Sequence, residues 1–154
     1  MEPKAVAESR TTMTEVVLPN DANAYGFILG GKVMHLMDMA AAVAAWRHCR
    51  KPVVTVSVDS VRFLSPVKVG QLILLDAFLT RSFRTSMEVE VHVFSEDPLT
   101  GQRMKTSDAF LTFVALGEDD RPTEVPPVKP ETPEELRRYE AAMERRRRRL
   151  TTKS

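Results

Sequence analysis

One aspartate, Asp38, lies in the middle of an apolar, helix-forming run, "GGKVMHLMDMAAAVAAW", which extends from Gly30 to Trp46. A carboxylate buried in such a segment costs several kcal/mol unless it is paired, hydrogen-bonded or used in a reaction. An aspartate can activate a water molecule as a general base or attack directly as a nucleophile. The alternative is a structural acid, bonded to a strand or paired with His35 one turn earlier.

The start of the same run offers a second chemical feature. Gly30 and Gly31 stand where the first backbone N–H groups of a helix are unpaired and the helix dipole is positive, which favours a developing oxyanion. Asp38 follows Gly31 by seven residues, or roughly 10 Å along a helix. One helix can therefore hardly present both groups to one small reacting bond. A site that uses both would take its carboxylate from a second subunit.

The other polar candidates are weaker. Asn23 lies in "PNDANAYG", where Asn, Asp and Gly are typical of turns, so it is either a turn residue or a member of the site. His35 and His92 have no recognisable metal spacing and are interpreted as structural. Cys49 has no activating motif and is interpreted as a small buried residue. No metal site is predicted, and no phosphate-binding glycine loop is evident.

Composition restricts the class of protein. The chain has 154 residues, 43% of them hydrophobic and 28% charged, with a net charge of +1, which predicts one globular domain with tails and no nucleic-acid partner. A single cysteine excludes an internal disulfide. The longest apolar run, Met39 to Trp46, is far shorter than the roughly 20 residues of a membrane span, and "MEPKAVAESRTT" is unlike a signal peptide. We expect a soluble, cytoplasmic protein without a membrane partner.

The elements that must position these residues follow from hydrophobic periodicity. A strand is predicted at residues 12–18, a helix at 31–48, and four further strands in "VVTVSVDSVRF", "GQLILLDAFLT", "TSMEVEVHVF" and "MKTSDAFLTFVAL". Alternation places Val54, Val56 and Val58 on one face. The short connections favour antiparallel pairing. Because the helix is apolar around nearly its whole circumference it must be buried, which predicts an α+β domain with a curved antiparallel sheet around one central helix, and a dimer that covers the remaining face.

The chain is divided by composition into four segments. We expect a flexible N-terminus at residues 1–10, the domain at 11–117, a proline-rich extended linker at 118–132 and a basic C-terminal helix or tail at 133–154. Thr132 is the predicted N-cap of that helix, with Glu135 three residues later. Residues 129–154 hold nine basic and five acidic side chains, against 13 and 16 in residues 1–128, so the basic excess lies in the tail.

The run "PNDANAYGFILGGKVMHLMD" combines Pro, a spaced Asn and Gly, a Gly-Gly pair and an Asp seven positions later. It resembles the hotdog-fold acyl-coenzyme A thioesterases, in particular the bacterial broad-specificity enzymes and the cytosolic acyl-CoA hydrolases of animals. Downstream, "VTVSVDSVRFLSPVKVGQ" and "RTSMEVEVHVFSED" are similar to later strands of that family. The resemblance covers about residues 11 to 130. One departure is Leu29, where the family usually has Phe.

This resemblance implies a fold, an assembly and a catalytic pair. The sheet would wrap the helix, two protomers would share a continuous sheet, and dimers would assemble into a homohexamer, a trimer of dimers. Asn23 and Asp38 would be the catalytic pair, contributed by different protomers, in the hydrolysis of acyl-CoA within fatty acid metabolism. Gly31 with Gly30 would form the oxyanion hole, Asn23 would orient the carbonyl or the water, and Thr55 would help to position Asp38 or the water.

Coenzyme A carries phosphates, so its site needs hydrogen-bond donors and positive charge. The resemblance implies that Arg84, Thr85 and Ser86 border that site, although Arg84 is equally explained as a solvated turn residue. The arginines from Arg145 to Arg149 are interpreted as a solvated helix face, with contact to the nucleotide of coenzyme A as the alternative. No cofactor is expected, because coenzyme A is part of the substrate and the product.

Two other functions stay open. Hotdog hydratases and dehydratases use a His paired with an acid, and here Asn23 stands where that His is expected, which favours hydrolysis. A non-catalytic acyl-CoA sensor would need a basic folded body to contact nucleic acid, whereas only the tail is basic. The acyl chain length is not predicted by spacing, since side chains such as Phe27, Leu29, Met34 and Phe63 can set the pocket depth.

Overall fold

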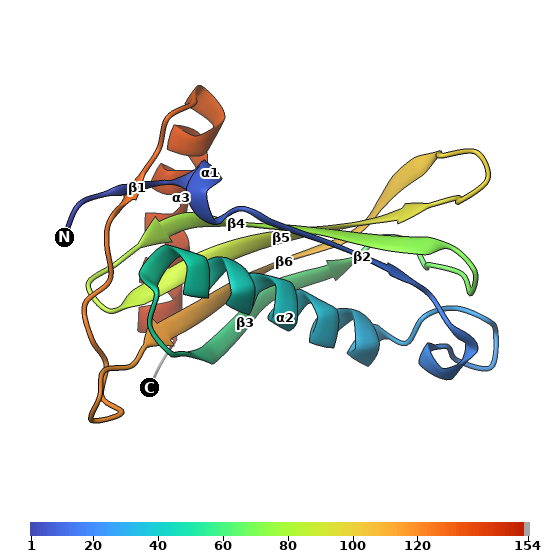
Figure 1. Ribbon diagram of the computed structural model, residues 1–154, viewed down its shortest axis with the longest axis horizontal. Coiled ribbons are helices and arrows are strands. Elements are labelled where there is room, and N and C mark those ends of the chain that lie inside the picture. Colours follow the sequence, from blue (N-terminus) through green and yellow to red (C-terminus); the bar gives the residue numbers. More distant parts are fainter. Residues whose placement is uncertain (153–154) are drawn as a thin grey trace.

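The computed structural model describes residues 1–152. Five antiparallel strands form one sheet in the order β2-β4-β5-β6-β3. Their bounds are Thr11–Val16 for β2, Val53–Phe63 for β3, Leu72–Ser82 for β4, Ser86–Glu96 for β5 and Arg103–Ala115 for β6. The long helix α2, Gly30–Cys49, lies across the inner face of this curved sheet (Figure 1). The predicted α+β architecture is confirmed.

The core lies between α2 and the inner face of the sheet. Small and apolar side chains let the helix approach the strands closely, and six of those on α2 are at most 1% exposed: Leu36, Met37, Ala40, Ala41, Ala44 and Ala45. The alternation of β5 turns Met87, Val89, Val91 and Val93 toward the helix, all with no exposed surface. Each alternate residue of the same strand, including Glu88 and Glu90, faces the opposite side of the sheet.

The prediction that α2 is buried all round is wrong for the single chain. Met34, Met39 and Trp46 are 40%, 45% and 49% exposed. Val54, Val56 and Val58 on β3, an edge strand of the sheet, are exposed as well. The prediction that they share one face is wrong, because the pairing of β3 with β6 shifts between Thr55 and Ser57 and leaves Val54 opposite Val114 but Val58 opposite Leu111, on the other side of the sheet. We call the surface formed by these side chains of α2 and β3 the open flank. An exposed apolar surface of this kind is typical of a contact with a partner.

The outer face of the sheet is covered by α3, Pro133–Thr151, which crosses the strands near the turn between β4 and β5 (Figure 1). The predicted N-cap is confirmed, because Thr132 Oγ1 accepts a hydrogen bond from Glu135 N at 3.0 Å. The Glu135 carboxylate accepts from Glu131 N instead of Thr132 N. Of the α3 side chains, Ala142 is fully buried.

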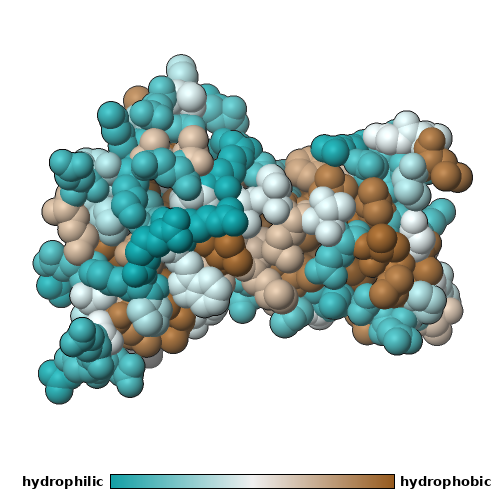
Figure 2. All heavy atoms as spheres, in the orientation of Figure 1, coloured by the Kyte–Doolittle hydropathy of each residue, from teal (hydrophilic) through white to brown (hydrophobic). Residues whose placement is uncertain are grey.

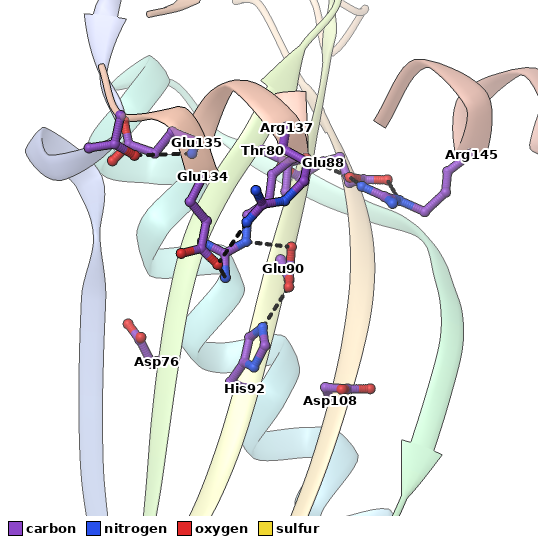
Figure 3. Close-up of polar contacts among 12 residues, drawn as sticks. Asp76, Thr80, Glu88, Glu90, His92, Asp108, Glu134, Glu135, Arg137 and Arg145 are labelled. Atoms are coloured by element: carbon purple, nitrogen blue, oxygen red, sulfur yellow. Dashed lines mark hydrogen bonds and ion pairs between the residues drawn. The ribbon is translucent and has the colours of Figure 1, made fainter. Parts of the chain in front are cut away.

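Charged side chains connect α3 to the outer face (Figure 3). Glu88, 1% exposed, accepts two hydrogen bonds from Arg145, at 2.9 and 2.8 Å, and one from Thr80 Oγ1 at 2.5 Å. Glu90 lies 3.5 Å from Arg138 and 2.5 Å from His92 Nε2. Arg145 also stacks on the Phe110 ring, 3.8 Å from its centroid. Arg145 is therefore packed against the sheet, which corrects the interpretation of the whole arginine run as a solvated face.

The segments predicted to be a flexible N-terminus and an extended linker meet in the structure. β1, Lys4–Ala5, pairs in parallel with β7, Val128–Lys129, and the short helix α1, Val6–Ser9, follows β1. Val6, Val125 and Val128 are buried. Their apolar side chains complete the core where the C-terminal end of α2 would otherwise be open. A 3-10 turn, η1, occupies Pro19–Asp21. No helix within residues 1–152 combines the length and apolarity required to cross a bilayer.

Candidate active site

The carboxylate of Asp38 is held by Thr55. Thr55 Oγ1 on β3 donates a hydrogen bond to Asp38 Oδ1 at 2.7 Å, and Asp38 is only half-buried. Within residues 1–152 no other hydrogen bond or ion pair uses this carboxylate, and His35 is exposed without pairing to it. Met34, one turn before Asp38, belongs to the open flank. One carboxylate oxygen is thus positioned, while the other is free beside a surface that is still uncovered.

The N-terminal end of α2 presents two unused donors. Leu29 is the N-cap and supplies no side-chain cap, and its carbonyl accepts from Lys32 N and Val33 N at 3.0 and 3.1 Å. In the described part of the chain, no hydrogen bond uses the N–H groups of Gly30 or Gly31. A Cβ on Gly31 would meet no atom within 4 Å, and one on Gly30 would lie 3.7 Å from the Phe63 ring. A ligand can therefore come close to the Cα atoms of both glycines without meeting a side chain of their own.

The loop before the helix fixes the amide of Asn23. Its Oδ1 accepts from Tyr25 N at 2.9 Å and from Phe27 N at 3.1 Å, as in an Asx turn. The turn interpretation is correct, and it also has a chemical consequence. Because both bonds require an acceptor, Oδ1 is the atom turned into the loop and Nδ2 is the donor left for a ligand.

Asn23 and Gly30 line one cavity of about 370 Å³. Its other walls combine apolar side chains with three hydroxyls, contributed by Phe27, Ile28, Val33, Phe63, Leu64, Ser65, Pro66, Val67, Thr106 and Ser107. Asp38 does not line it. Sequence patterns did not select Thr106 and Ser107, because only the register of β6 with β3, in which Ser107 pairs with Phe63, places them beside the helix start.

The coenzyme A candidates lie at the other end of the sheet. Arg84, Thr85 and Ser86 occupy the turn into β5, and Ser86 pairs with Val114. Val54, next to Thr55, pairs with Val114 from the other side. Arg84 through Ser86 therefore share an end with Thr55 and Asp38, opposite to Asn23 and Gly30. The Arg84 side chain is exposed, which fits both interpretations of it.

Other titratable residues lie outside this arrangement. Burial lowers the pKa of His48, whose Nε2–H in the neutral ring donates to Pro126 O at 2.7 Å. Burial raises the pKa of the Cys49 thiol, and Cys49 is 5% exposed, as expected for a structural residue. His92 contacts Glu90 on the outer face. Among residues 1–152, no three His, Cys, Asp or Glu side chains are grouped so that they could hold a metal ion.

A curved antiparallel sheet wrapped around one long helix is the architecture of a hotdog domain. The chain belongs to the thioesterase superfamily, whose family model matches residues 25–102. The predicted family is confirmed.

Two relatives illustrate the range of the family. YkhA of Bacillus subtilis, named an uncharacterized acyl-CoA thioester hydrolase, is 40% identical over 144 residues, covering 94% of this chain and 84% of the relative. The cytosolic acyl coenzyme A thioester hydrolase of Rattus norvegicus is 37% identical over 142 residues, covering 90% of this chain. The match spans only 37% of the rat protein's own length.

Solved structures agree closely with this fold. An apo-hexameric acyl-CoA thioesterase has a TM-score of 0.95 and 45% identity, over 99% of this chain and 97% of the other. An acyl-CoA hydrolase of Staphylococcus aureus, solved with butyryl coenzyme A, coenzyme A and coenzyme A disulfide, has a TM-score of 0.91 and 35% identity, over 97% of this chain and 91% of the other.

The Staphylococcus aureus hydrolase was also solved as alanine variants of one asparagine, one aspartate and one threonine. In that protein the asparagine precedes the aspartate by 15 positions, and the threonine follows the aspartate by 17. Asn23, Asp38 and Thr55 have the same two spacings here.

Proposed function

We propose that the protein hydrolyses acyl-CoA thioesters to a free fatty acid and coenzyme A. The observation that carries this proposal is the division of reactive groups between two ends of the sheet. Unused donors of Gly30, Gly31 and Asn23 lie at one end, and the Thr55-bound carboxylate of Asp38 lies at the other, beside the open flank. The family and its acyl-CoA hydrolases support the same chemistry.

A dimer through β3 would complete the site. If the exposed edge of β3 pairs antiparallel with its copy about a two-fold axis, each end of one strand meets the opposite end of the other. The partner's Asp38 then approaches Asn23 and Gly31, and the apolar side chains of the open flank become covered. Two equivalent sites result. The hexameric state of one structural relative supports a trimer of such dimers.

The reaction follows from these roles. The free oxygen of Asp38 takes a proton from a water molecule, and the water oxygen attacks the thioester carbon. The oxyanion accepts hydrogen bonds from the N–H groups of Gly31 and Gly30, while Asn23 Nδ2 donates to the carbonyl oxygen or the water. When the C–S bond breaks, Asp38 returns the proton to the leaving sulfur, which gives the coenzyme A thiol. Direct attack by the same oxygen is the alternative, with water cleaving the resulting anhydride.

The surroundings support a position for each of the two parts of the substrate. The cavity beside Asn23 and Gly30 suits an acyl chain, because most of its wall is apolar. Arg84, Thr85 and Ser86 share an end with Asp38, so in the dimer they would approach the same substrate from the partner and contact coenzyme A. No separate cofactor takes part. A cytoplasmic location is supported by the cytosolic rat relative.

The first test is steady-state hydrolysis of acyl-CoAs from acetyl to palmitoyl, followed with a thiol reagent. Asp38→Ala should lower kcat by about 10²- to 10⁴-fold, with the oligomer unchanged by light scattering. Asp76→Ala, which alters a carboxylate on the outer face, is the matched control and should retain activity. Acyl-CoA binding without turnover in the wild type would favour a sensor. Full activity of the Asp38→Ala variant would contradict the proposed mechanism.

Complementation tests the shared site. Asn23→Ala and Asp38→Ala chains, each inactive alone, are produced together so that mixed dimers form. Each mixed dimer contains one intact site, so about a quarter of the wild-type activity should return after random pairing. No recovery, with mixed dimers demonstrated by mass spectrometry, would place both residues of each site in one chain.

A further inference from the structure

The five arginines at the end of α3 have unequal surroundings. Arg145 is fixed by Glu88 beneath it, and Arg149 Nη1 lies 3.5 Å from Asp59 on β3. Their side chains are 21% and 16% exposed, whereas those of Arg147 and Arg148 are 68% and 75% exposed. Two guanidinium groups are thus held against the sheet, and neighbouring ones extend outward.

A cavity of about 220 Å³ lies between the end of α3 and β3. We call it the arginine cavity; it is lined by Asp59, Ser60, Arg145, Arg148, Arg149 and Thr152. Three arginines, a serine and a threonine therefore line the cavity together with one aspartate. The volume is sufficient for one or two phosphate groups.

The positive charge of the arginine cavity is incompletely matched. Glu88 neutralises Arg145, but Arg148 shares Glu144 with Arg147, at 3.8 and 2.8 Å. Arg149 Nη1 is buried and has no hydrogen-bond partner within residues 1–152, since its approach to Asp59 lacks hydrogen-bond geometry. Buried donors of this kind are normally satisfied. The carboxyl end of α3 adds a partial negative charge, so within residues 1–152 the cavity offers unused guanidinium donors of Arg148 and Arg149 rather than a large net positive charge.

The strand wall of the arginine cavity is irregular. The pairing of β3 with β6 breaks between Asp59 and Arg62, and within the break Ser60 has a φ of 53°. A positive φ is costly for a residue other than glycine, and such bulges redirect side chains near functional sites. Ser60 lies within this break and lines the arginine cavity from the strand side.

We propose that the arginine cavity binds a phosphate-bearing anion. Guanidinium groups donate paired hydrogen bonds to phosphate oxygens, and such bonds are stronger than neutral ones. Arg145 and Arg149 are already ordered, so they lose little freedom on binding. The Arg148 side chain, which is exposed, moves toward the bound anion and donates hydrogen bonds to it. The anion is either a free phosphate compound or a phosphate group of the coenzyme A substrate.

The test uses pyrophosphate as the probe, titrated into the full chain by calorimetry at constant ionic strength. The wild type should bind saturably, and Arg148→Gln should weaken binding by about tenfold, the size of one charge-assisted contact. Arg147→Gln is the matched control: it removes the same charge from the adjacent position, also paired with Glu144, but outside the cavity. Asp59→Asn should tighten binding, because it removes the carboxylate from the wall.

The same variants distinguish the two sources of the anion. If the cavity receives coenzyme A, Arg148→Gln raises KM for acyl-CoA and pyrophosphate competes with the substrate. If it receives a free anion, KM stays unchanged and pyrophosphate does not compete. Absence of saturable binding by the wild type, or equal weakening by Arg147→Gln and Arg148→Gln, would overturn the proposal, since both indicate only general attraction to a basic surface.

Discussion

The two faces of the sheet are covered by helices of opposite character. Against the inner face, α2 places leucine, methionine and alanine side chains that have almost no exposed surface. Against the outer face, α3 has one fully buried side chain, Ala142, and makes its other contacts through Tyr139 and through arginines paired with buried glutamates. The exposed surface differs along the long axis too: in Figure 2 hydrophobic residues are denser at the end of the molecule away from α3 than at the end that holds α3.

This difference separates two ways of fixing a helix on a sheet. Apolar burial is nearly additive and does not depend on a particular partner. A buried ion pair gains little over an apolar pair, but removal of one partner leaves a charge without compensation. The inner face should therefore respond to the loss of volume, and the outer face to the loss of charge balance.

The largest expected effect is on the outer face. Arg145→Met should lower the free energy of unfolding by about 3–5 kcal/mol, because the buried Glu88 loses its partner. Adding Glu88→Gln to Arg145→Met should restore most of this loss, as the charge is then absent. Urea unfolding measures both. A loss below about 1 kcal/mol for Arg145→Met would mean that water already solvates Glu88.

The next effect is on the inner face. Leu36→Ala should cost about 3 kcal/mol in urea unfolding, through lost burial and the cavity left behind. Leu136→Ala on α3, where the leucine is 47% exposed, is the control and should cost less than about 0.5 kcal/mol. The loss at Leu36 should be the same at low salt and at about 1 M NaCl. If the loss of unfolding free energy in Leu36→Ala depended on salt, the inner face would not differ from the outer face in the way described.

The smallest effect concerns Asp108 on the outer face. A hydrogen bond from Arg62, with a smaller contribution from Lys105, lowers the pKa of Asp108 to about 2. Since the folded pKa lies below the unfolded value, this stabilisation is present above about pH 4 and disappears as the pH falls toward 2. Arg62→Gln should therefore destabilise the protein at neutral pH but not near pH 2. Parallel acid-unfolding curves for wild type and variant would contradict this assignment.

The sequence predicted the inner face better than the outer one. The strands and α2 were found because their periodicity is local, and the Thr132 cap is a local signal too. The arginine partners of Glu88 and Glu90 are more than 45 residues away in the chain. The alternation in "MEVEVHV" therefore indicated a polar face but not the helix that covers it. The prediction of a fully buried α2 failed because a helix that is apolar all round can lie in the core or can contribute to a surface that contacts another chain. Its sequence is similar in both cases.

The candidate site was also predicted only in part, because only some of its residues are close together in the sequence. Asp38 and the two glycines were selected from one helix. The structure adds a hydrogen bond from Thr55 to Asp38, and the supporting role of Thr55 stays a prediction. The locked amide of Asn23 required the loop conformation, and Ser107 required the register of two strands. Both depend on positions in space that spacing along the chain does not encode.

The division of reactive groups between the two ends of β3 has a consequence for enzyme concentration. In the proposed dimer each site combines groups from both protomers, so a single chain contains no complete site. The rate of hydrolysis therefore depends on the fraction of chains that are paired. Specific activity should fall on dilution below the dimer dissociation constant, and a newly synthesised chain would leave cellular thioesters intact until it found its copy.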